Sequence, residues 1–129
     1  GEVDPSAGLT APERWKPADF YLQQQILGTV PWGKLYARSC FASIRYPVGT
    51  YFDDEYVTYR ILFAQEYLPV VPARLYAYYW NPEGLTKKPW NPRRMEVWQA
   101  YEQQIDFFTR RADADMCAFR FRECLCPAA

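Results

Sequence analysis

Two neighbouring carboxylates, Asp53 and Asp54, have the type and spacing most suited to chemistry. They open a segment, 53–65, whose apolar residues recur at a helical spacing. An ionised carboxylate accepts protons and hydrogen bonds, and the start of a helix favours this ionised form while lowering its basicity. Helix capping alone would also produce acidic residues at such a position. The pattern therefore leaves a chemical role and a structural role open.

Four cysteines, Cys40, Cys117, Cys124 and Cys126, form a second group with reactive side chains. Their spacings match no common zinc pattern, and because the chain contains no histidine, a metal site that includes histidine is excluded. Reduced thiols, some of them buried, are the simplest interpretation, and a disulfide or a soft-metal site is the alternative.

The aromatic residues make up 19% of the chain, with eleven Tyr and five Trp. This content suits either a dense core or a surface that stacks on sugars. Packing in the core is the commoner role for such side chains. Composition does not choose between the two roles for Trp32, Tyr76, Tyr78 and Tyr79.

Length and charge limit the class of protein. A chain of 129 residues with 50% hydrophobic composition is long enough for one domain. Fifteen basic residues balance fifteen acidic ones, so nucleic acid is not expected as a partner. No apolar run is long enough to span a membrane, and the first residues do not resemble a signal peptide. Because the first residue is not Met, we expect a processed chain or a piece of a longer protein.

The residue patterns predict an α+β domain over 18–112 that is mostly helical with a few short strands. Residues 1–17 hold three prolines and predict an irregular lead-in or linker, with one short helical turn opened by Thr10 and Glu13. The predicted elements that follow are a helix at 18–27 stopped by Gly28, a strand at 30–37, a helical turn at 38–42, a loop at 44–52 and a helix at 53–65 that is buried almost all round.

The second half of the chain has one clear helix. Residues 68–80 are strand-like but are broken by prolines into two short pieces, of which 75–79 is the stronger. A loop follows at 81–89. Asn91 is a good N-cap, Pro92 suits the first helical position, and the apolar spacing predicts a helix that ends near Arg111. The tail at 113–129 has no clear periodicity, so no element is predicted there.

The order of several short motifs resembles the acceptor half of bacterial family 2 glycosyltransferases, which build surface polysaccharides. The motifs are PWGKLYAR at 31–38, RYP at 45–47, YFDDEYVTYR at 51–60 and LYAYY at 75–79. In that family a W-x-K-L-Y segment leads to an acidic pair that opens a helix continuing into T-Y-R. The resemblance covers roughly residues 18 to 110.

This resemblance implies the C-terminal portion of a GT-A fold without its nucleotide-binding α/β half. The family reaction moves a sugar from a nucleotide sugar to an acceptor hydroxyl with inversion. By position, Asp54 is the general base, and Asp53, which replaces the usual Glu, is a supporting acid. The expected substrate-binding residues are Trp32, Lys34, Arg60, Tyr76 and Tyr78. Structural pairing is the alternative for Lys34 and Arg60.

A donor site is missing from the sequence. The resemblance implies that the parent enzyme holds a divalent metal, Mg or Mn, through an Asp-x-Asp motif upstream of the acceptor region. Asp113-Ala114-Asp115 matches this motif but lies far downstream of Asp54, so no metal ligand is assigned in the chain. We expect the isolated piece to be inactive, and its parent to be cytoplasmic, at the inner face of the membrane.

Two other hypotheses remain open. The chain is either a non-catalytic carbohydrate-binding or protein-interaction domain that uses its exposed aromatic residues, or a piece that self-associates through apolar surface left uncovered.

Overall fold

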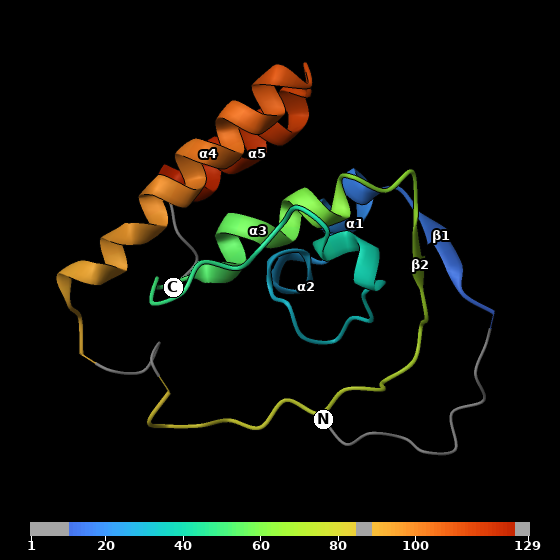
Figure 1. Ribbon diagram of the computed structural model, residues 1–129, viewed down its shortest axis with the longest axis horizontal. Helices are drawn as coiled ribbons and strands as arrows, with labels where there is room; N and C mark the ends of the chain where they lie inside the picture. The colour runs from blue at the N-terminus through green and yellow to red at the C-terminus, as the bar shows by residue number, and fades with distance from the viewer. Residues whose placement is uncertain (1–10, 85–88, 126–129) are drawn as a thin grey trace.

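A computed structural model of the chain describes residues 11–84 and 89–125. The protein is mostly helical with one small two-stranded sheet, which confirms the α+β class (Figure 1). The elements of the described ranges are β1 (Glu13–Trp15), α1 (Pro17–Gln23), α2 (Gln25–Thr29), the 3-10 turn η1 (Arg38–Phe41), α3 (Asp53–Leu62), β2 (Leu68–Val70), the 3-10 turn η3 (Pro92–Met95), α4 (Glu96–Arg110) and α5 (Ala114–Leu125).

The sheet joins the segment before α1 to the segment after α3. β1 pairs antiparallel with β2, with Glu13 opposite Val70 and Trp15 opposite Leu68. The predicted helical turn at Glu13 is therefore wrong, because its backbone pairs with a distant segment, and Thr10 lies outside the described residues. The predicted strand at 75–79 is also wrong, since this segment is extended but has no ladder partner among the described residues.

The predicted helix at 18–27 is two helices. α1 begins at Pro17, which suits the first turn, and the backbone at Gln24 leaves helical geometry with φ −105° and ψ 47°. Gly28 lies inside α2 instead of stopping a helix. A Cβ at this position would meet the Cα of Tyr21 at 3.3 Å, so glycine allows α2 to approach α1 closely.

The segment between α2 and α3 is mainly irregular. No strand forms at 30–37, contrary to the prediction, whereas η1 confirms the turn at 38–42 and bends and turns confirm the loop at 44–52. Proline and glycine in the loop explain why it was predictable.

An aromatic core joins α1, α3, α4 and α5. Phe108 is fully buried at its centre, with ring centroids 4.9 Å from Phe63, 6.1 Å from Tyr59 and 6.5 Å from Tyr21. These rings meet edge-on or tilted, which is the arrangement that aromatic quadrupoles favour. The buried core cluster consists of Phe20, Tyr21, Tyr59, Leu62, Phe63, Phe108 and Met116. α3 contributes several buried residues to the core, which confirms the predicted helix, but it ends at Leu62 instead of 65 and Arg60 on it is exposed.

α4 and α5 form a hairpin that lies along one side of the molecule (Figure 1). The side chain of Asn91 accepts a hydrogen bond from the Arg93 amide, which confirms its capping role, although the cap opens η3 and α4 follows it. The chain then turns at Ala112, whose φ is 54°. Asp113 caps the next helix by accepting a hydrogen bond from the Met116 amide at 3.1 Å. The sequence patterns did not predict α5.

No helix within 11–84 or 89–125 is long and apolar enough to cross a membrane.

Candidate functional site

Asp54 lies in the first turn of α3, directly after a strained residue. The N-cap is Phe52, whose φ of 58° is left-handed and uncommon for an aromatic residue. No side chain makes a capping hydrogen bond at this helix end. The Oδ1 atom of Asp54 accepts a hydrogen bond from its neighbour, the Glu55 amide, at 3.0 Å. Neither acid is the N-cap residue, and the Asp54 carboxylate binds a first-turn amide of its own helix.

The carboxyl group of Asp54 is a stronger base than an ordinary aspartate. Burial raises its pKa to about 6, the negative charge of Glu55 adds to the rise, and that of Asp53 adds less. Hydrogen bonds from backbone amides act in the opposite direction but are outweighed. The helix start does lower the basicity of Asp54, as expected, but desolvation is the larger effect, so the net pKa is raised.

Lys34 is the cation that interacts with Asp54. Burial lowers the pKa of its ammonium group to about 8, and the Asp54 carboxylate raises that pKa in part. The Nζ atom also donates a hydrogen bond to the Val30 carbonyl at 2.6 Å. Lys34 therefore has a hydrogen bond to the backbone of Val30 and, separately, an electrostatic interaction with the predicted base, Asp54.

Three of the predicted substrate-binding residues meet in one aromatic stack. The ring of Trp32 lies 5.1 Å from that of Tyr76 at an interplanar angle of 12°, and 5.2 Å from that of Tyr78 at 33°. Tyr76 and Tyr78 are 51% and 60% exposed, and Tyr79 is 85% exposed. Packing in the core is therefore the wrong interpretation for these tyrosines. They belong to an extended segment that follows β2 along the lower edge of Figure 1.

Lys34 and Trp32 belong to the same short segment, 30–37. This segment therefore carries both Trp32 of the aromatic stack and Lys34, whose pKa the Asp54 carboxylate raises. Arg60, in contrast, is exposed on α3, and within the described residues it has no hydrogen bond or ion pair. The structure does not bring Arg60 to the other predicted residues.

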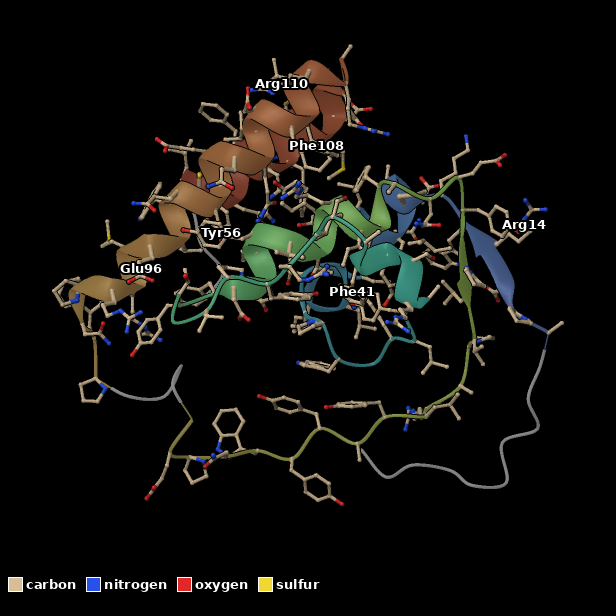
Figure 2. The ribbon with its side chains drawn as sticks, viewed as in Figure 1. Arg14, Phe41, Tyr56, Glu96, Phe108 and Arg110 are labelled. Carbon is tan, nitrogen blue, oxygen red and sulfur yellow. The ribbon has the colours of Figure 1, made fainter. Side chains whose placement is uncertain are left out.

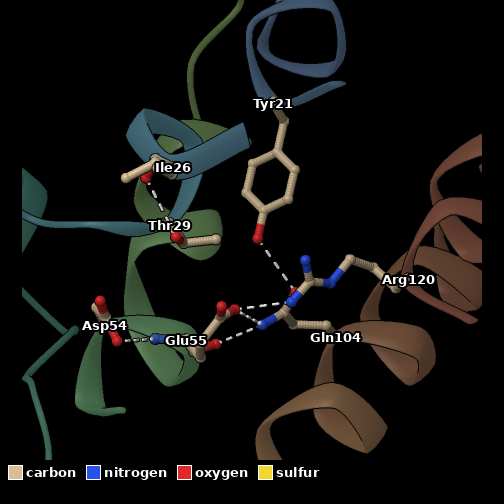
Figure 3. A network of polar contacts seen from close by, with 7 residues as sticks. All are labelled: Tyr21, Ile26, Thr29, Asp54, Glu55, Gln104 and Arg120. Carbon is tan, nitrogen blue, oxygen red and sulfur yellow. Dashed lines mark hydrogen bonds and ion pairs between the residues drawn. The ribbon is translucent and has the colours of Figure 1, made fainter. Parts of the chain in front are cut away.

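A polar network on the other side of Glu55 was not predicted from the sequence. The Nη2 atom of Arg120 lies 2.7 Å from Oε2 of Glu55, and Gln104 Nε2 donates to the same carboxylate oxygen at 2.9 Å. Tyr21 donates its hydroxyl hydrogen to Gln104 Oε1 at 3.2 Å. In the view of Figure 3, Asp54 and Arg120 lie on opposite sides of Glu55. Polar residues at buried helix positions were the only signal in the sequence.

The loop before α3 is held by the start of α4. Glu96 accepts a hydrogen bond from the Tyr51 amide at 2.9 Å and forms an ion pair with Arg93 at 2.8 Å. Arg93 in turn donates to the Gly49 carbonyl. The Tyr56 hydroxyl donates to the carbonyl of Glu96 at 2.7 Å, and both of these residues are labelled in Figure 2. These contacts fix the backbone on both sides of the acidic pair.

The described cysteines and the Asp-x-Asp motif at 113–115 take no part in the contacts of this site. Cys40, Cys117 and Cys124 are free thiols, and Cys126 lies outside the described residues. In the part of the chain that the structure describes, no three His, Cys, Asp or Glu residues gather in a way that could hold a metal ion. Asp113 has a structural role as the cap of α5.

No protein-family model matches this chain, and no curated protein or solved structure is significantly similar to it. The resemblance to family 2 glycosyltransferases therefore depends on the motifs from Trp32 to Tyr79 alone.

Proposed function

We propose that this chain is the acceptor side of an inverting glycosyltransferase of the family 2 type, with Asp54 as the general base. The observation that carries the proposal is the state of Asp54: a half-buried carboxyl group with a pKa raised to about 6, at the helix start where the resemblance expects the base. A general base works best when its pKa lies near the working pH.

The chemistry follows from this pKa. The acceptor hydroxyl oxygen forms a bond to the anomeric carbon of the donor sugar while the bond from that carbon to the nucleotide phosphate breaks. The proton of the hydroxyl passes to the carboxylate of Asp54. At pH 7 most Asp54 side chains are ionised and able to accept it, yet they are more basic than an ordinary aspartate. Attack from the face opposite the leaving phosphate inverts the anomeric carbon.

The aromatic stack supplies a surface for the acceptor. Binding sites for organic ligands combine aromatic faces with a few polar groups, and the segment 30–37 joins both kinds here. Tyr76 and Tyr78, which stack with Trp32, offer exposed ring surface, and Lys34 adds a cation whose pKa the Asp54 carboxylate raises. We propose that a sugar ring of the acceptor packs on this stack with one hydroxyl directed to Asp54.

The donor site belongs to the parent enzyme in this proposal. An α/β half upstream of Gly1 would bind the nucleotide sugar, and a divalent metal, Mg or Mn, held there would neutralise the departing diphosphate. The isolated chain is then inactive, and the parent acts in the synthesis of a surface polysaccharide from the cytoplasmic side.

The test is sugar transfer by the protein that includes the upstream half. The D54N variant should lose about 100-fold to 10,000-fold in kcat, since general base catalysis contributes a factor of this size. The D53N variant is the matched control, because it removes the neighbouring carboxylate, and it should lose far less. Undiminished transfer by D54N would remove Asp54 from the mechanism.

A second candidate function is favoured by the exposed tyrosines. A non-catalytic carbohydrate-binding domain would use the same stack without any chemistry at Asp54. Titration of the chain with oligosaccharides, followed by NMR, separates the two candidates. Binding that is lost in Y76A but kept in Y79A, together with full transfer by D54N, would favour the binding domain. Light scattering on the isolated chain tests self-association, and a monomer at high concentration would exclude it.

A further inference from the structure

Glu55, the residue that follows Asp54, is held by side chains from two other helices, and a third helix supports one of these side chains. Arg120 of α5 forms an ion pair with its carboxylate at 2.7 Å, and the Arg120 side chain is only 3% exposed (Figure 3). Gln104 of α4 donates to the Glu55 carbonyl at 2.6 Å as well as to its carboxylate. Tyr21 of α1 donates to Gln104. The first turn of α3 is thus fixed through both the backbone and the side chain of Glu55.

This arrangement is not what stability alone would select. Removing two charges from water is costly, and apolar residues of similar volume often replace a buried ion pair without loss of stability. The Nε atom of Arg120 is also buried without a hydrogen-bond partner among the described residues. An unsatisfied buried donor lowers stability further. The network therefore calls for a role beyond packing.

We propose that Arg120 is a positioning residue for Asp54, which it serves by fixing Glu55, whose amide donates a hydrogen bond to the Asp54 carboxylate. The inference depends on the proposed function for its purpose, since a negative neighbour makes Asp54 a better proton acceptor. α5 is then part of the site, although it touches neither Asp54 nor the aromatic stack in the contacts described above.

Several charged and titratable groups surround Asp54 and Glu55. Glu55 and Asp53 face Asp54 from α3, and Lys34 faces it from the segment 30–37. Arg120 faces Glu55 from α5, Tyr101 from α4 and Tyr21 from α1. Glu123 acts on Arg120 and Tyr101 and is absent from the causes that shift Asp54. Substitution of Glu123 is therefore a matched control.

The experiment is an NMR titration of the Asp54 side-chain carboxyl in the 129-residue chain. E55Q replaces the carboxylate with an uncharged amide of nearly the same shape. Because the negative charge is removed, the apparent pKa of Asp54 should fall by about one unit. R120M should also lower it, because Glu55 loses the ion pair that holds its carboxylate inside the protein, and that side chain can then turn into water, where its charge is screened. R120K, which keeps the charge, should restore most of the wild-type value, and E123Q should leave it unchanged.

A double variant shows whether Arg120 acts through Glu55. E55Q/R120M should titrate Asp54 at the same pH as E55Q alone. An unchanged Asp54 pKa in E55Q, or a further shift when R120M is added to E55Q, would overturn the inference. If R120M does not fold, the Asp54 pKa values of E55Q, R120K and E123Q still test the inference. It requires a lower value in E55Q and values close to the wild type in R120K and E123Q. Because the titration requires no transfer activity, its failure would leave the role of Asp54 in catalysis to its own test.

Discussion

The guanidinium of Arg120 lies 2.7 Å from the carboxylate of Glu55, which is 65 residues earlier in the chain. Both side chains are buried, at 3% and 14% exposure. This ion pair ties the last described helix, α5, to the first turn of α3, in which the predicted base is located. The stability of the fold and the properties of Asp54 therefore depend on the same contact.

Breaking this pair from one side should strongly destabilise the fold. E55A leaves Arg120 charged and unpaired in the interior, and we expect a loss of about 3–5 kcal/mol in the free energy of unfolding. R110A is the matched control, because Arg110 forms an ion pair with Asp106 at 77% and 58% exposure. That variant should lose less than about 1 kcal/mol in chemical denaturation. Equal losses in the two variants would show that the Glu55–Arg120 pair is not buried in solution.

The aromatic core should be sensitive to the loss of Phe108. This residue is fully buried among other rings, so F108A should lower the free energy of unfolding by about 3–5 kcal/mol. F121A on α5 removes the same side chain where it is 56% exposed, and its effect should be within about 1 kcal/mol. Thermal unfolding of both variants checks the expectation. A mild effect of F108A would place the core elsewhere.

The raised pKa of Asp54 should appear in the pH dependence of stability. The folded state holds the Asp54 proton up to a pH of about 6, whereas the unfolded state releases it near its ordinary value of 3.8. The folded state therefore binds more protons between these values, so the contribution of Asp54 to stability is present at low pH and is lost as pH rises through 6.

D54N removes this dependence. At pH 7 the variant no longer buries a charge, and it should be more stable than the wild type by about 1–2 kcal/mol, allowing for the partial exposure of Asp54. D53N should keep most of the wild-type pH dependence, with a slightly lower midpoint, because the charge of Asp53 adds a little to the pKa of Asp54. Denaturant titrations between pH 4 and pH 8 give both comparisons, and a D54N variant that is less stable at pH 7 would contradict the desolvation of this carboxyl.

The electrostatic contact between Asp54 and Lys34 gives a separate expectation. Since the carboxylate raises the pKa of Lys34, D54N should lower that pKa further below about 8. NMR titration of the lysine side chain measures it directly. D53N is again the control, with an unchanged Lys34. An identical Lys34 titration in D54N and the wild type would separate the two groups in space.

Local signals explain which elements were predictable. Asn91, Pro92 and the apolar spacing behind them specify a cap and a helix within a few residues, and Pro47 and Gly49 specify a loop. α3 was predictable because its apolar residues cover several faces. Each of these patterns lies within a few consecutive residues, so the sequence alone reveals it.

Tertiary contacts explain the elements that were missed. β1 exists because Glu13–Trp15 pairs with Leu68–Val70, and no local pattern contains that partner. α5 was hidden because its buried face includes Arg120, a charged residue where the helical pattern expects an apolar one. The close approach of Gly28 to Tyr21 is likewise a contact between two helices that no local pattern contains.

The site was predictable in its residue types but not in its physical state. Asp54, Lys34 and Trp32 were identified by motif, and the stack of Trp32 on Tyr76 brings two of the predicted residues together. The rise of the Asp54 pKa was not predictable, because it depends on burial and on Glu55. Arg60 was chosen by position in a motif, and its exposure was not foreseeable.

The most direct test of Asp54 as the base is the pH dependence of kcat/KM for transfer by the protein that includes the donor half. In the wild type and in D53N, kcat/KM should fall below a pH of about 6, with a slope of one, because protonated Asp54 cannot accept the proton of the acceptor. D54N should have a low rate without this acidic limb. An acidic limb of the same midpoint in D54N would contradict the account, because another group would then be the base.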